Sequence, residues 1–288
     1  MDPKTRIEKA LEAAVSRTET QGAPPLLAAA IRHAVFPAGA RVRPRLCLAV
    51  AAACGADEVA GSSAAVAIEL LHCASLVHDD LPCFDDAATR RGKPSVHAAF
   101  GQPIAVLAGD ALIVLAFETL ARGLQSVPSR LAELVLIVAS AVGMPFGIVA
   151  GQAWESEPEA SLEAYQRAKT GSLFVAAAAA GAAAAGHEPR AWRDFAERLG
   201  EAYQIADDIR DVACSSAQMG KPAGQDAALG RPNAVAKLGL QGASDLLAAL
   251  VAGAVDAIPP CPGRDKLRAL VLQETRLVLP KDLAQQAA

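Results

Sequence analysis

Aromatic residues are scarce in this chain: phenylalanine, tryptophan and tyrosine together make up 4% of its 288 residues. Strands favour aromatic and β-branched residues, whereas alanine, leucine, glutamate and arginine favour helices. These helix-favouring residues dominate long tracts of the chain, in which 52% of all residues are hydrophobic. The composition therefore predicts an all-α fold.

An excess of basic residues is also missing, because 27 Lys and Arg stand against 31 Asp and Glu, for a net charge of −4. This balance provides no general attraction to nucleic acid or to an anionic membrane surface. Any site for an anion must therefore be a local cluster of basic side chains. We expect no nucleic-acid partner.

The chain has no C-x-x-C pair, although it contains six cysteines, several of them within apolar helical stretches. Buried free thiols in a reducing cytoplasm explain this usage better than a disulfide framework does. The charged residues 1–9 lack the apolar core of a secretory signal. We therefore predict a cytoplasmic protein.

A convincing membrane span is missing as well. The best candidate is the uncharged run of residues 134–150, which Gly143, Pro145 and Gly147 interrupt. It is slightly shorter than the roughly 20 residues that a spanning helix requires. We interpret it as a buried helix and predict no membrane span.

Short breaks rich in proline and glycine divide the chain, and none is long enough for a domain linker. We therefore predict one domain over residues 1–288. Residues 172–185 are apolar on all sides, which indicates a central helix, although an alanine tract can also be drift in a biased genome. The predicted helices cover residues 4–18, 25–36, 41–54, 57–79, 94–98, 103–124, 129–151, 161–185, 189–212, 226–238, 242–255 and 262–278.

Two aspartate clusters end apolar helical stretches, and the first is Asp79-Asp80-Leu81-Pro82-Cys83-Phe84-Asp85. Like charges this close repel one another unless cations neutralise them, and Mg²⁺ suits carboxylate oxygens, water and phosphates. On an ideal helix Asp79 and Asp85 would diverge by about 240°. We expect Pro82 to end or distort the helix, so that the next turn brings Asp85 back toward Asp79.

The second cluster is Asp207-Asp208-Ile209-Arg210-Asp211, in which Asp207 and Asp211 share a helix face. Basic residues follow each cluster, at positions 90–94 and 220–226. Carboxylates, metal ions and Arg or Lys together hold a diphosphate and stabilise it as a leaving group. One cluster could be a solvated helix end, but the pair predicts a metal-dependent site for a diphosphate.

The motifs around these clusters resemble the trans-isoprenyl diphosphate synthases, most closely the bacterial geranylgeranyl diphosphate synthases of carotenoid pathways. The resemblance spans nearly the whole chain. Besides the two clusters, it rests on His72-Cys73-Ala74-Ser75-Leu76-Val77-His78, Arg90-Arg91-Gly92-Lys93-Pro94, Gly151-Gln152, Lys169-Thr170-Gly171, Tyr203-Gln204 and Gly220-Lys221.

The resemblance implies an all-α bundle around a central cavity, usually a homodimer, with the two clusters facing each other across the mouth. In that family an allylic diphosphate binds about three Mg²⁺ ions and ionises. The double bond of isopentenyl diphosphate then attacks the allylic cation, and a proton is lost.

The resemblance also assigns roles to single residues of this sequence. Direct metal contacts fall to Asp79, Asp85 and Asp207, while Asp80, Asp208 and Asp211 orient metal-bound water or complete the shell. Arg90, Lys169 and Lys221 match positions that hold the allylic diphosphate. The isopentenyl diphosphate site is matched by Arg43, His72 and Arg91. Thr170 and Gln204 match polar groups beside the reacting carbons.

Two positions depart from the family's pattern. Ala40 replaces a lysine that normally contacts isopentenyl diphosphate, which predicts weaker binding of that substrate unless Arg41 or Arg45 compensates. Arg231 stands where a lysine is usual and keeps the charge of the substrate site.

Chain length in this family depends on side chains one or two helical turns before the first cluster. Ala74 is small where short-chain relatives tend to carry an aromatic ring, and Leu71 lines the next turn. We therefore expect geranylgeranyl diphosphate as the product. The alternatives are a farnesyl diphosphate synthase and a non-catalytic subunit of a heteromeric synthase, with a terpene cyclase less favoured.

Overall fold

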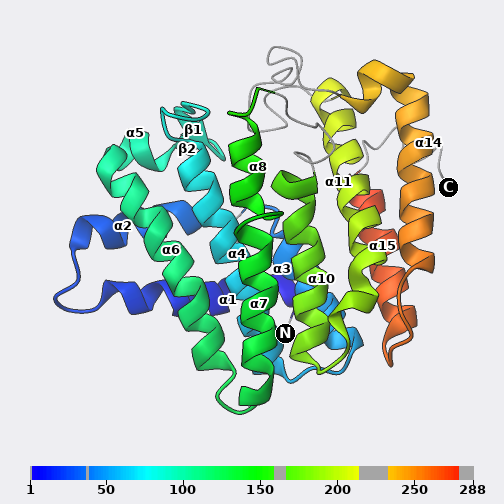
Figure 1. The fold of residues 1–288 in the computed structure, drawn as a ribbon, viewed down its shortest axis with the longest axis horizontal. Helices are drawn as coiled ribbons and strands as arrows, with labels where there is room; N and C mark the ends of the chain where they lie inside the picture. Colours follow the sequence, from blue (N-terminus) through cyan, green and yellow to red (C-terminus); the bar gives the residue numbers. More distant parts are fainter. Residues whose placement is uncertain (1, 37–38, 159–166, 214–232, 279–288) are drawn as a thin grey trace. The chain divides into compact units, whose positions relative to one another are not determined.

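The computed structural model describes residues 2–36, 39–158, 167–213 and 233–278, which are helical almost throughout (Figure 1). Contacts divide the chain into two compact units, Met1–Pro189 and Arg190–Ala288. The all-α class is confirmed, whereas the single domain over residues 1–288 stays a prediction.

The first unit holds most of the helices. Its elements are α1 (Pro3–Ser16), η1 (Arg17–Glu19), α2 (Pro25–Val35), α3 (Val42–Ala53), α4 (Glu58–Asp79), β1 (Thr89–Arg90), β2 (Lys93–Pro94), α5 (Val96–Phe100), α6 (Gln102–Gly123), η2 (Pro128–Arg130), α7 (Leu131–Val142), α8 (Ile148–Trp154), the π-helical turn η3 (Arg167–Gly171) and α10 (Ser172–Ala184).

Helix α4 is the centre of the first unit, because it packs against α1, α3, α6 and α10 (Figure 1). Its N-terminus is capped by Asp57, whose carboxylate accepts hydrogen bonds from the amides of Val59 (2.9 Å) and Ala60 (3.1 Å). Most of the helix between Ala60 and Val77 is buried. Burial on all sides positions the C-terminal end of α4 rigidly, and the first aspartate cluster begins there.

Helices α4 and α6 approach each other closely at two glycines of α6. A Cβ atom on Gly123 would lie 1.8 Å from Ser63 Oγ, and one on Gly109 would lie 2.0 Å from His78 Nε2. Neither position can carry a side chain without displacing its neighbour. The two contacts also show that the helices are antiparallel, because the later residue of α4 meets the earlier residue of α6.

The alanine-rich helix α10 is internal, as its lack of a polar face predicts. Every residue from Ala176 to Ala184 is buried, together with Leu173 and Phe174. The helix packs against α3, α4 and α7. Small side chains therefore serve here for close helix packing.

The helix predicted over residues 129–151 is wrong, because the structure divides it into α7 and α8. The break covers residues 143–147 and contains a cis peptide bond between Met144 and Pro145. Proline has no amide hydrogen to continue the helical ladder, so the two short helices replace one long helix. The run of residues 134–150 is therefore no continuous helix.

Among the described residues, three other helices are long and apolar enough, by length and composition alone, to cross a membrane: α4, α6 and α14 (Ala234–Asp256). The most apolar window of α4 is 67% buried within the protein, against 44% for α6 and 28% for α14. The apolar character of α4 therefore matches its central place in the first unit. The absence of a membrane span stays a prediction.

A short hairpin of two two-residue strands, β1 and β2, follows the first aspartate cluster and was not predicted from the sequence. Arg90 pairs with Lys93, and the residues between them, Arg91 and Gly92, have φ values of 54° and 75°. Two central residues with positive φ are typical of the type I′ turn that closes tight hairpins. The hairpin delays the next helix, α5, to Val96 instead of the predicted residue 94.

The described part of the second unit contains η4 (Pro189–Trp192), which begins at the boundary, α11 (Arg193–Ala213), α14 and α15 (Arg264–Val278). Helices α11 and α14 share a core of small and aliphatic residues: Ala202, Ala206, Ile209, Ala243, Leu247 and Val251. Gly239 interrupts α14 with a φ of 71°. This break corresponds to the predicted gap between residues 238 and 242, while residues 226–232 of the predicted helix lie outside the described residues.

Candidate active site

The first aspartate cluster forms a tight turn at the end of α4. The Leu81 amide donates to the carbonyl of His78 (3.1 Å), and the Asp85 amide donates to the carbonyl of Asp79 (3.0 Å). The chain thus reverses around Pro82 and brings Asp85 back beside Asp79, as predicted from the proline. Asp85 is exposed, whereas the Asp79 side chain is 17% exposed.

Asp79 shares the cationic Lys169 with a second carboxylate. Lys169 Nζ lies 3.4 Å from Asp79 Oδ1 and 2.5 Å from Glu155 Oε1. Burial raises the pKa of Asp79; Lys169 opposes that shift, and the nearby charges of Asp85 and Glu155 add to it. Two carboxylates on one ammonium, with the charge of Asp85 also acting on Asp79, leave an excess of negative charge, which suits a site for added cations.

Lys169 belongs to the π-helical turn η3, which packs directly on α8. A Cβ atom on Gly151 of α8 would lie 2.6 Å from the Lys169 amide nitrogen and 2.7 Å from its Cα. Only glycine allows this approach. Single π-helical turns are frequent at functional sites, and this one places Lys169 beside the end of α4.

Sequence reasoning missed Glu155. It lies four residues after Gly151 and three after Gln152, the pair that contributed to the family resemblance. Residues three and four apart lie on the same helix face, so this spacing is the signal that could have identified Glu155.

Asp79 and Asp85 fit a hard divalent cation. Asp79 Oδ1 is buried and accepts no well-formed hydrogen bond in the described part of the chain, and its ion pair with Lys169 is long, at 3.4 Å, so this oxygen can also contact a metal. Within the described ranges no three His, Cys, Asp or Glu side chains form a ready metal cluster. Mg²⁺ suits such a partial set, because it uses one or two carboxylates and fills its other positions with water and phosphate oxygens.

Asp80 binds Arg90 of the hairpin. Arg90 Nε donates to both carboxylate oxygens of Asp80, at 3.0 and 3.2 Å, and Nη2 donates to Oδ1. The Asp80 side chain is almost fully buried, and this burial raises its pKa although the charge of Arg90 opposes the shift. Asp80 therefore fixes Arg90 next to the cluster, and its role toward metal-bound water stays a prediction.

The three residues predicted for isopentenyl diphosphate lie together in the first unit. Arg43 Nη1 is 3.5 Å from His72 Nε2, and the Arg43 guanidinium lies over the Phe174 ring, 4.9 Å from its centroid. Burial and then the charges of Arg43 and Arg91 hold the pKa of His72 well below its usual value. The group therefore combines arginine charge with a neutral imidazole.

Arg91 reaches this group across the loop before α3. Its guanidinium lies so close to Gly39 that an added Cβ would be 2.8 Å from Cζ. Ala40, the residue that replaces the family's lysine, is exposed. Arg91 therefore lies beside the loop from which that lysine would extend.

Arg41 does not compensate for Ala40, because it is fully occupied in the core. Its side chain is completely buried, with Nε 2.9 Å from Glu8 Oε1, Nη1 2.5 Å from Glu69 Oε1 and Nη2 2.8 Å from the carbonyl of Val35. Its backbone begins α3 in the left-handed region, with a φ of 51°. Arg41 thus anchors the loop that carries Gly39 and Ala40.

Leu71 and Ala74, the residues predicted to limit chain length, are each 1% exposed. They lie between Ser63 and His78, the two residues of α4 that meet glycines of α6. Residues 71, 74 and 78 are spaced by three and four and share one helix face. Ala74 therefore lies on the face of α4 that packs against α6.

The second aspartate cluster lies on α11. Asp207 Oδ1 is 2.8 Å from Arg210 Nη2. Asp208 is buried and accepts hydrogen bonds from Gln204 Nε2 (3.0 Å) and from the Ala234 amide at the start of α14 (2.8 Å). Asp208 therefore joins α11 to α14, and the catalytic roles assigned to Asp208 and Gln204 stay predictions.

Several predicted site residues cannot be placed. Lys221 and Arg231 lie outside the described residues, as do the side chains of Thr170 and Asp211. The two units are not placed relative to each other, so the facing of the two clusters across a cavity also stays a prediction.

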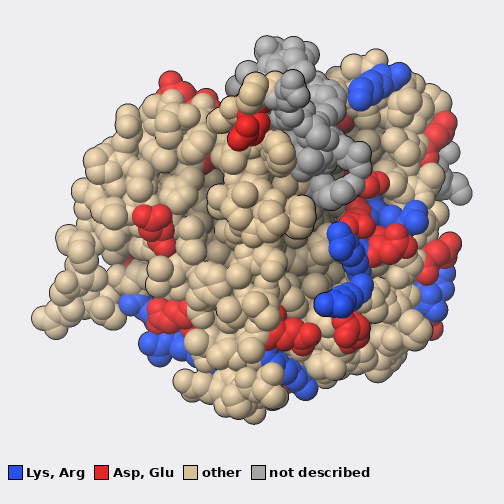
Figure 2. Space-filling model, in the orientation of Figure 1, with Lys and Arg blue, Asp and Glu red and all other residues tan. Residues whose placement is uncertain are grey.

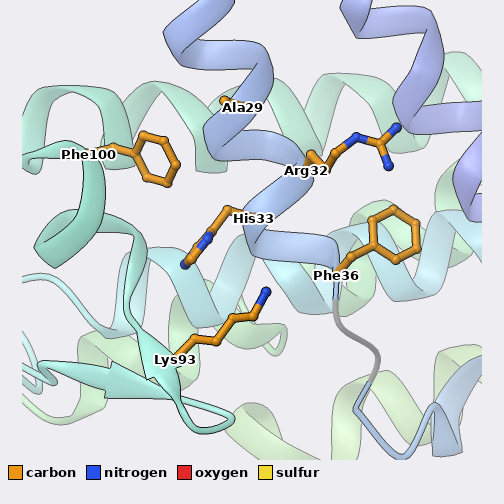
Figure 3. Close-up of a pocket in the computed structure, with 6 residues that line it drawn as sticks. All are labelled: Ala29, Arg32, His33, Phe36, Lys93 and Phe100. Atoms are coloured by element: carbon orange, nitrogen blue, oxygen red, sulfur yellow. The ribbon is translucent and has the colours of Figure 1, made fainter.

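An open hollow of about 440 Å³ lies elsewhere in the first unit, beside the hairpin (Figure 3). It is lined by Ala29, Arg32, His33, Phe36, Lys93 and Phe100. His33 Nε2 lies 2.8 Å from the carbonyl of Pro94, and Arg32 binds Glu12 and Glu19. None of the predicted catalytic, substrate or metal residues lines this hollow. The carboxylate and arginine groups around Asp79 are therefore the better candidate for the active site.

Comparisons with known proteins identify the family of the chain. The sequence model of the polyprenyl synthetase family matches residues 24–254. A geranylgeranyl diphosphate synthase of Cereibacter sphaeroides is 52% identical over 280 residues, which cover 97% of each chain. Another, of Rhodobacter capsulatus, is 52% identical over 267 residues, or 92% of each chain.

A solved structure supports the same assignment. The geranyltransferase of Helicobacter pylori, complexed with magnesium and isoprenyl diphosphate, superposes with a TM-score of 0.76 and 29% identity, covering 95% of this chain and 98% of its own. The chain therefore belongs to the polyprenyl synthetase family and is a trans-prenyltransferase.

Proposed function

We propose that the protein condenses isopentenyl diphosphate with an allylic diphosphate in the trans configuration, uses Mg²⁺, and releases geranylgeranyl diphosphate. The observation that carries the proposal is the pair of carboxylates, Asp79 and Glu155, on Lys169, together with Arg90, which Asp80 binds beside them. Identity of 52% to geranylgeranyl diphosphate synthases over almost the full length supports the product.

The described residues form two groups, one for each diphosphate substrate. Lys169 and Arg90 carry positive charge next to Asp79 and Asp80, where an allylic diphosphate and its metal ions would bind. Bound Mg²⁺ would neutralise the charge that develops on the diphosphate leaving group. Arg43 and Arg91 hold the second diphosphate, and the neutral imidazole of His72 donates or accepts a hydrogen bond without adding charge.

Ala74 supports a product longer than C15. It lies five residues before Asp79 on the buried face of α4 that meets α6, and its methyl group occupies little space there. Short-chain relatives in the family tend to carry an aromatic ring at this position, so a larger side chain here is expected to shorten the product. Leu71 lies one turn further from Asp79 and would limit a longer tail.

Product analysis of the purified protein tests this proposal, with Mg²⁺, labelled isopentenyl diphosphate and each allylic starter in turn. We expect mainly C20 product, and mainly C15 product would refute the assignment. Ala74→Tyr is expected to shorten the product to C15, whereas Ala74→Gly keeps the space and the C20 product. Unchanged C20 output from folded Ala74→Tyr would mean that another residue limits the chain.

The same assay separates an enzyme from a non-catalytic subunit. A subunit would show no turnover alone and would gain it only with a partner synthase. The carboxylates around Lys169 favour the enzyme, because a subunit without chemistry gains nothing from mutually repelling acids in a half-buried site. We further infer a cytoplasmic protein that supplies a C20 precursor to carotenoid synthesis, as the resemblance implies.

We also propose that the protein forms a homodimer through neighbouring faces of α6, α7 and α8. Large apolar side chains are exposed along these helices and in the break between α7 and α8: Val106, Leu107, Val114, Leu136, Met144, Phe146 and Val149. Figure 2 shows that the surface over these helices carries few charged side chains. Extended apolar surface of this kind is characteristic of protein interfaces, and a second copy of the chain is the occupant that the family resemblance implies.

A further inference from the structure

The ammonium group of Lys169 lies between two carboxylates at unequal distances. Its Nζ atom is 2.5 Å from Glu155 Oε1 and 3.4 Å from Asp79 Oδ1. All three side chains are less than one-third exposed, so solvent screens their charges only in part. Lys169 is therefore hydrogen-bonded to Glu155, and its interaction with Asp79 is the longer and weaker one.

The carboxylate of Glu155 is itself held in place. Gln152 Nε2 donates a hydrogen bond of 2.8 Å to Oε2, the oxygen that does not bind Lys169. The backbone beneath is also fixed, because Gly151 brings α8 into direct contact with the backbone of Lys169. Glu155 and Lys169 thus meet in a defined geometry set by two elements in contact.

This geometry leaves an oxygen of Asp79 available. Asp79 Oδ1 is buried and accepts no well-formed hydrogen bond in the described part of the chain. If the ammonium moved the remaining distance to Asp79, it would occupy that oxygen and compete with any cation there. The nearer carboxylate of Glu155 opposes this movement.

We propose that Glu155 is a positioning residue: it holds the Lys169 ammonium away from full pairing with Asp79, which keeps Asp79 available to Mg²⁺ and Lys169 available to a diphosphate. The inference rests on the proposed function, because it concerns the same site. It assigns a role to a residue outside both aspartate clusters. Glu155→Gln removes the charge but keeps the shape, so Lys169 then shifts toward Asp79.

The test compares Glu155→Gln and Glu155→Asp with the wild type, and Glu157→Gln serves as the control. Glu157 is exposed, follows the same helix and carries the same charge. We expect Glu155→Gln to raise the Mg²⁺ concentration for half-maximal turnover about tenfold, as for a lost hydrogen bond between charged groups. At saturating Mg²⁺ the kcat should recover to within about threefold. The Mg²⁺ concentration for half-maximal turnover of Glu155→Asp should lie between those of the wild type and Glu155→Gln. That of Glu157→Gln should match the wild type.

A binding measurement makes the result independent of turnover. Calorimetric titration with farnesyl thiolodiphosphate, an unreactive allylic analogue, should show about tenfold weaker binding to Glu155→Gln at limiting Mg²⁺. Unchanged Mg²⁺ dependence and unchanged analogue binding in a folded variant would overturn the proposal. If thermal melting shows that Glu155→Gln is unfolded, Glu155→Asp decides by the same two criteria. An inactive wild type would instead count against the proposed function, while the binding comparison still tests Glu155.

Discussion

The loss of Arg41 should be costly to the fold, because its guanidinium neutralises the buried Glu69 as well as the partly exposed Glu8. Its side chain is fully buried, and so is Glu69 at 2% exposure, while Glu8 is 28% exposed. Arg41→Met keeps the volume but leaves the Glu69 carboxylate buried without its cation. Removing one partner of a buried ion pair costs about 3–5 kcal/mol. That is a large part of the roughly 5–15 kcal/mol that separates native from unfolded proteins.

The double variant Arg41→Met/Glu69→Met distinguishes this reasoning from a simple loss of packing. It removes both buried charges, and Glu8 can turn toward solvent, so it should be more stable than Arg41→Met by about 2 kcal/mol. Melting should show a loss of about 10 °C for the single variant, and part of that loss should be regained in the double variant.

The matched control is Arg193→Met, which breaks an exposed pair with Glu197 at a distance of 2.7 Å. Surface pairs contribute at most about 1 kcal/mol, so its melting temperature should barely change. Two results would refute the reasoning. One is an Arg41→Met variant that melts at the same temperature as Arg193→Met. The other is a double variant whose loss of stability equals the sum of the losses of Arg41→Met and Glu69→Met.

Two further predictions concern His72 and the apolar face of α6 to α8. The pKa of His72 is depressed in the folded state. Below about pH 6.5 the unfolded chain therefore binds a proton that the folded chain does not, and the stability of the folded state decreases as the pH is lowered. His72→Gln should therefore lose less melting temperature than the wild type between pH 7 and pH 5, and equal losses would exclude this role of His72. Leu136→Glu/Phe146→Glu should convert a dimer into monomers in light scattering while the far-ultraviolet circular dichroism is kept, and a variant that remains dimeric would place the interface elsewhere.

Helix type and order were predictable because apolar periodicity and punctuation are local properties of the sequence. The failures lie where tertiary structure or a special backbone geometry decides. The helix predicted over residues 129–151 breaks around Pro145. The continuous apolar run favoured one helix, but proline cannot donate the hydrogen bond that would continue it. The hairpin at Arg90 to Lys93 depends on two positive φ values in a segment with no strand pattern.

The candidate site was predictable where a charge cluster is continuous in sequence. The turn that returns Asp85 to Asp79 followed from Pro82 alone, and it is confirmed. Glu155 was missed because its relation to Lys169 depends on the contact of α8 with η3, which is not a local property. The ion pairs of Arg41 were missed for the same reason, since its partners Glu8 and Glu69 are distant in the sequence.

The proposed substrate site also accounts for the absence of the family's lysine at position 40. Ala40 is exposed, so a lysine there would extend from a solvated loop, where screening makes a single charge worth little. Arg91 already lies against the neighbouring Gly39, and Arg43 stacks on Phe174 within the half-buried part of the same group. A buried, oriented guanidinium binds a diphosphate more strongly than a mobile surface ammonium does. If Arg43 and Arg91 bind isopentenyl diphosphate as proposed, the chain retains the two charges that matter most for that substrate.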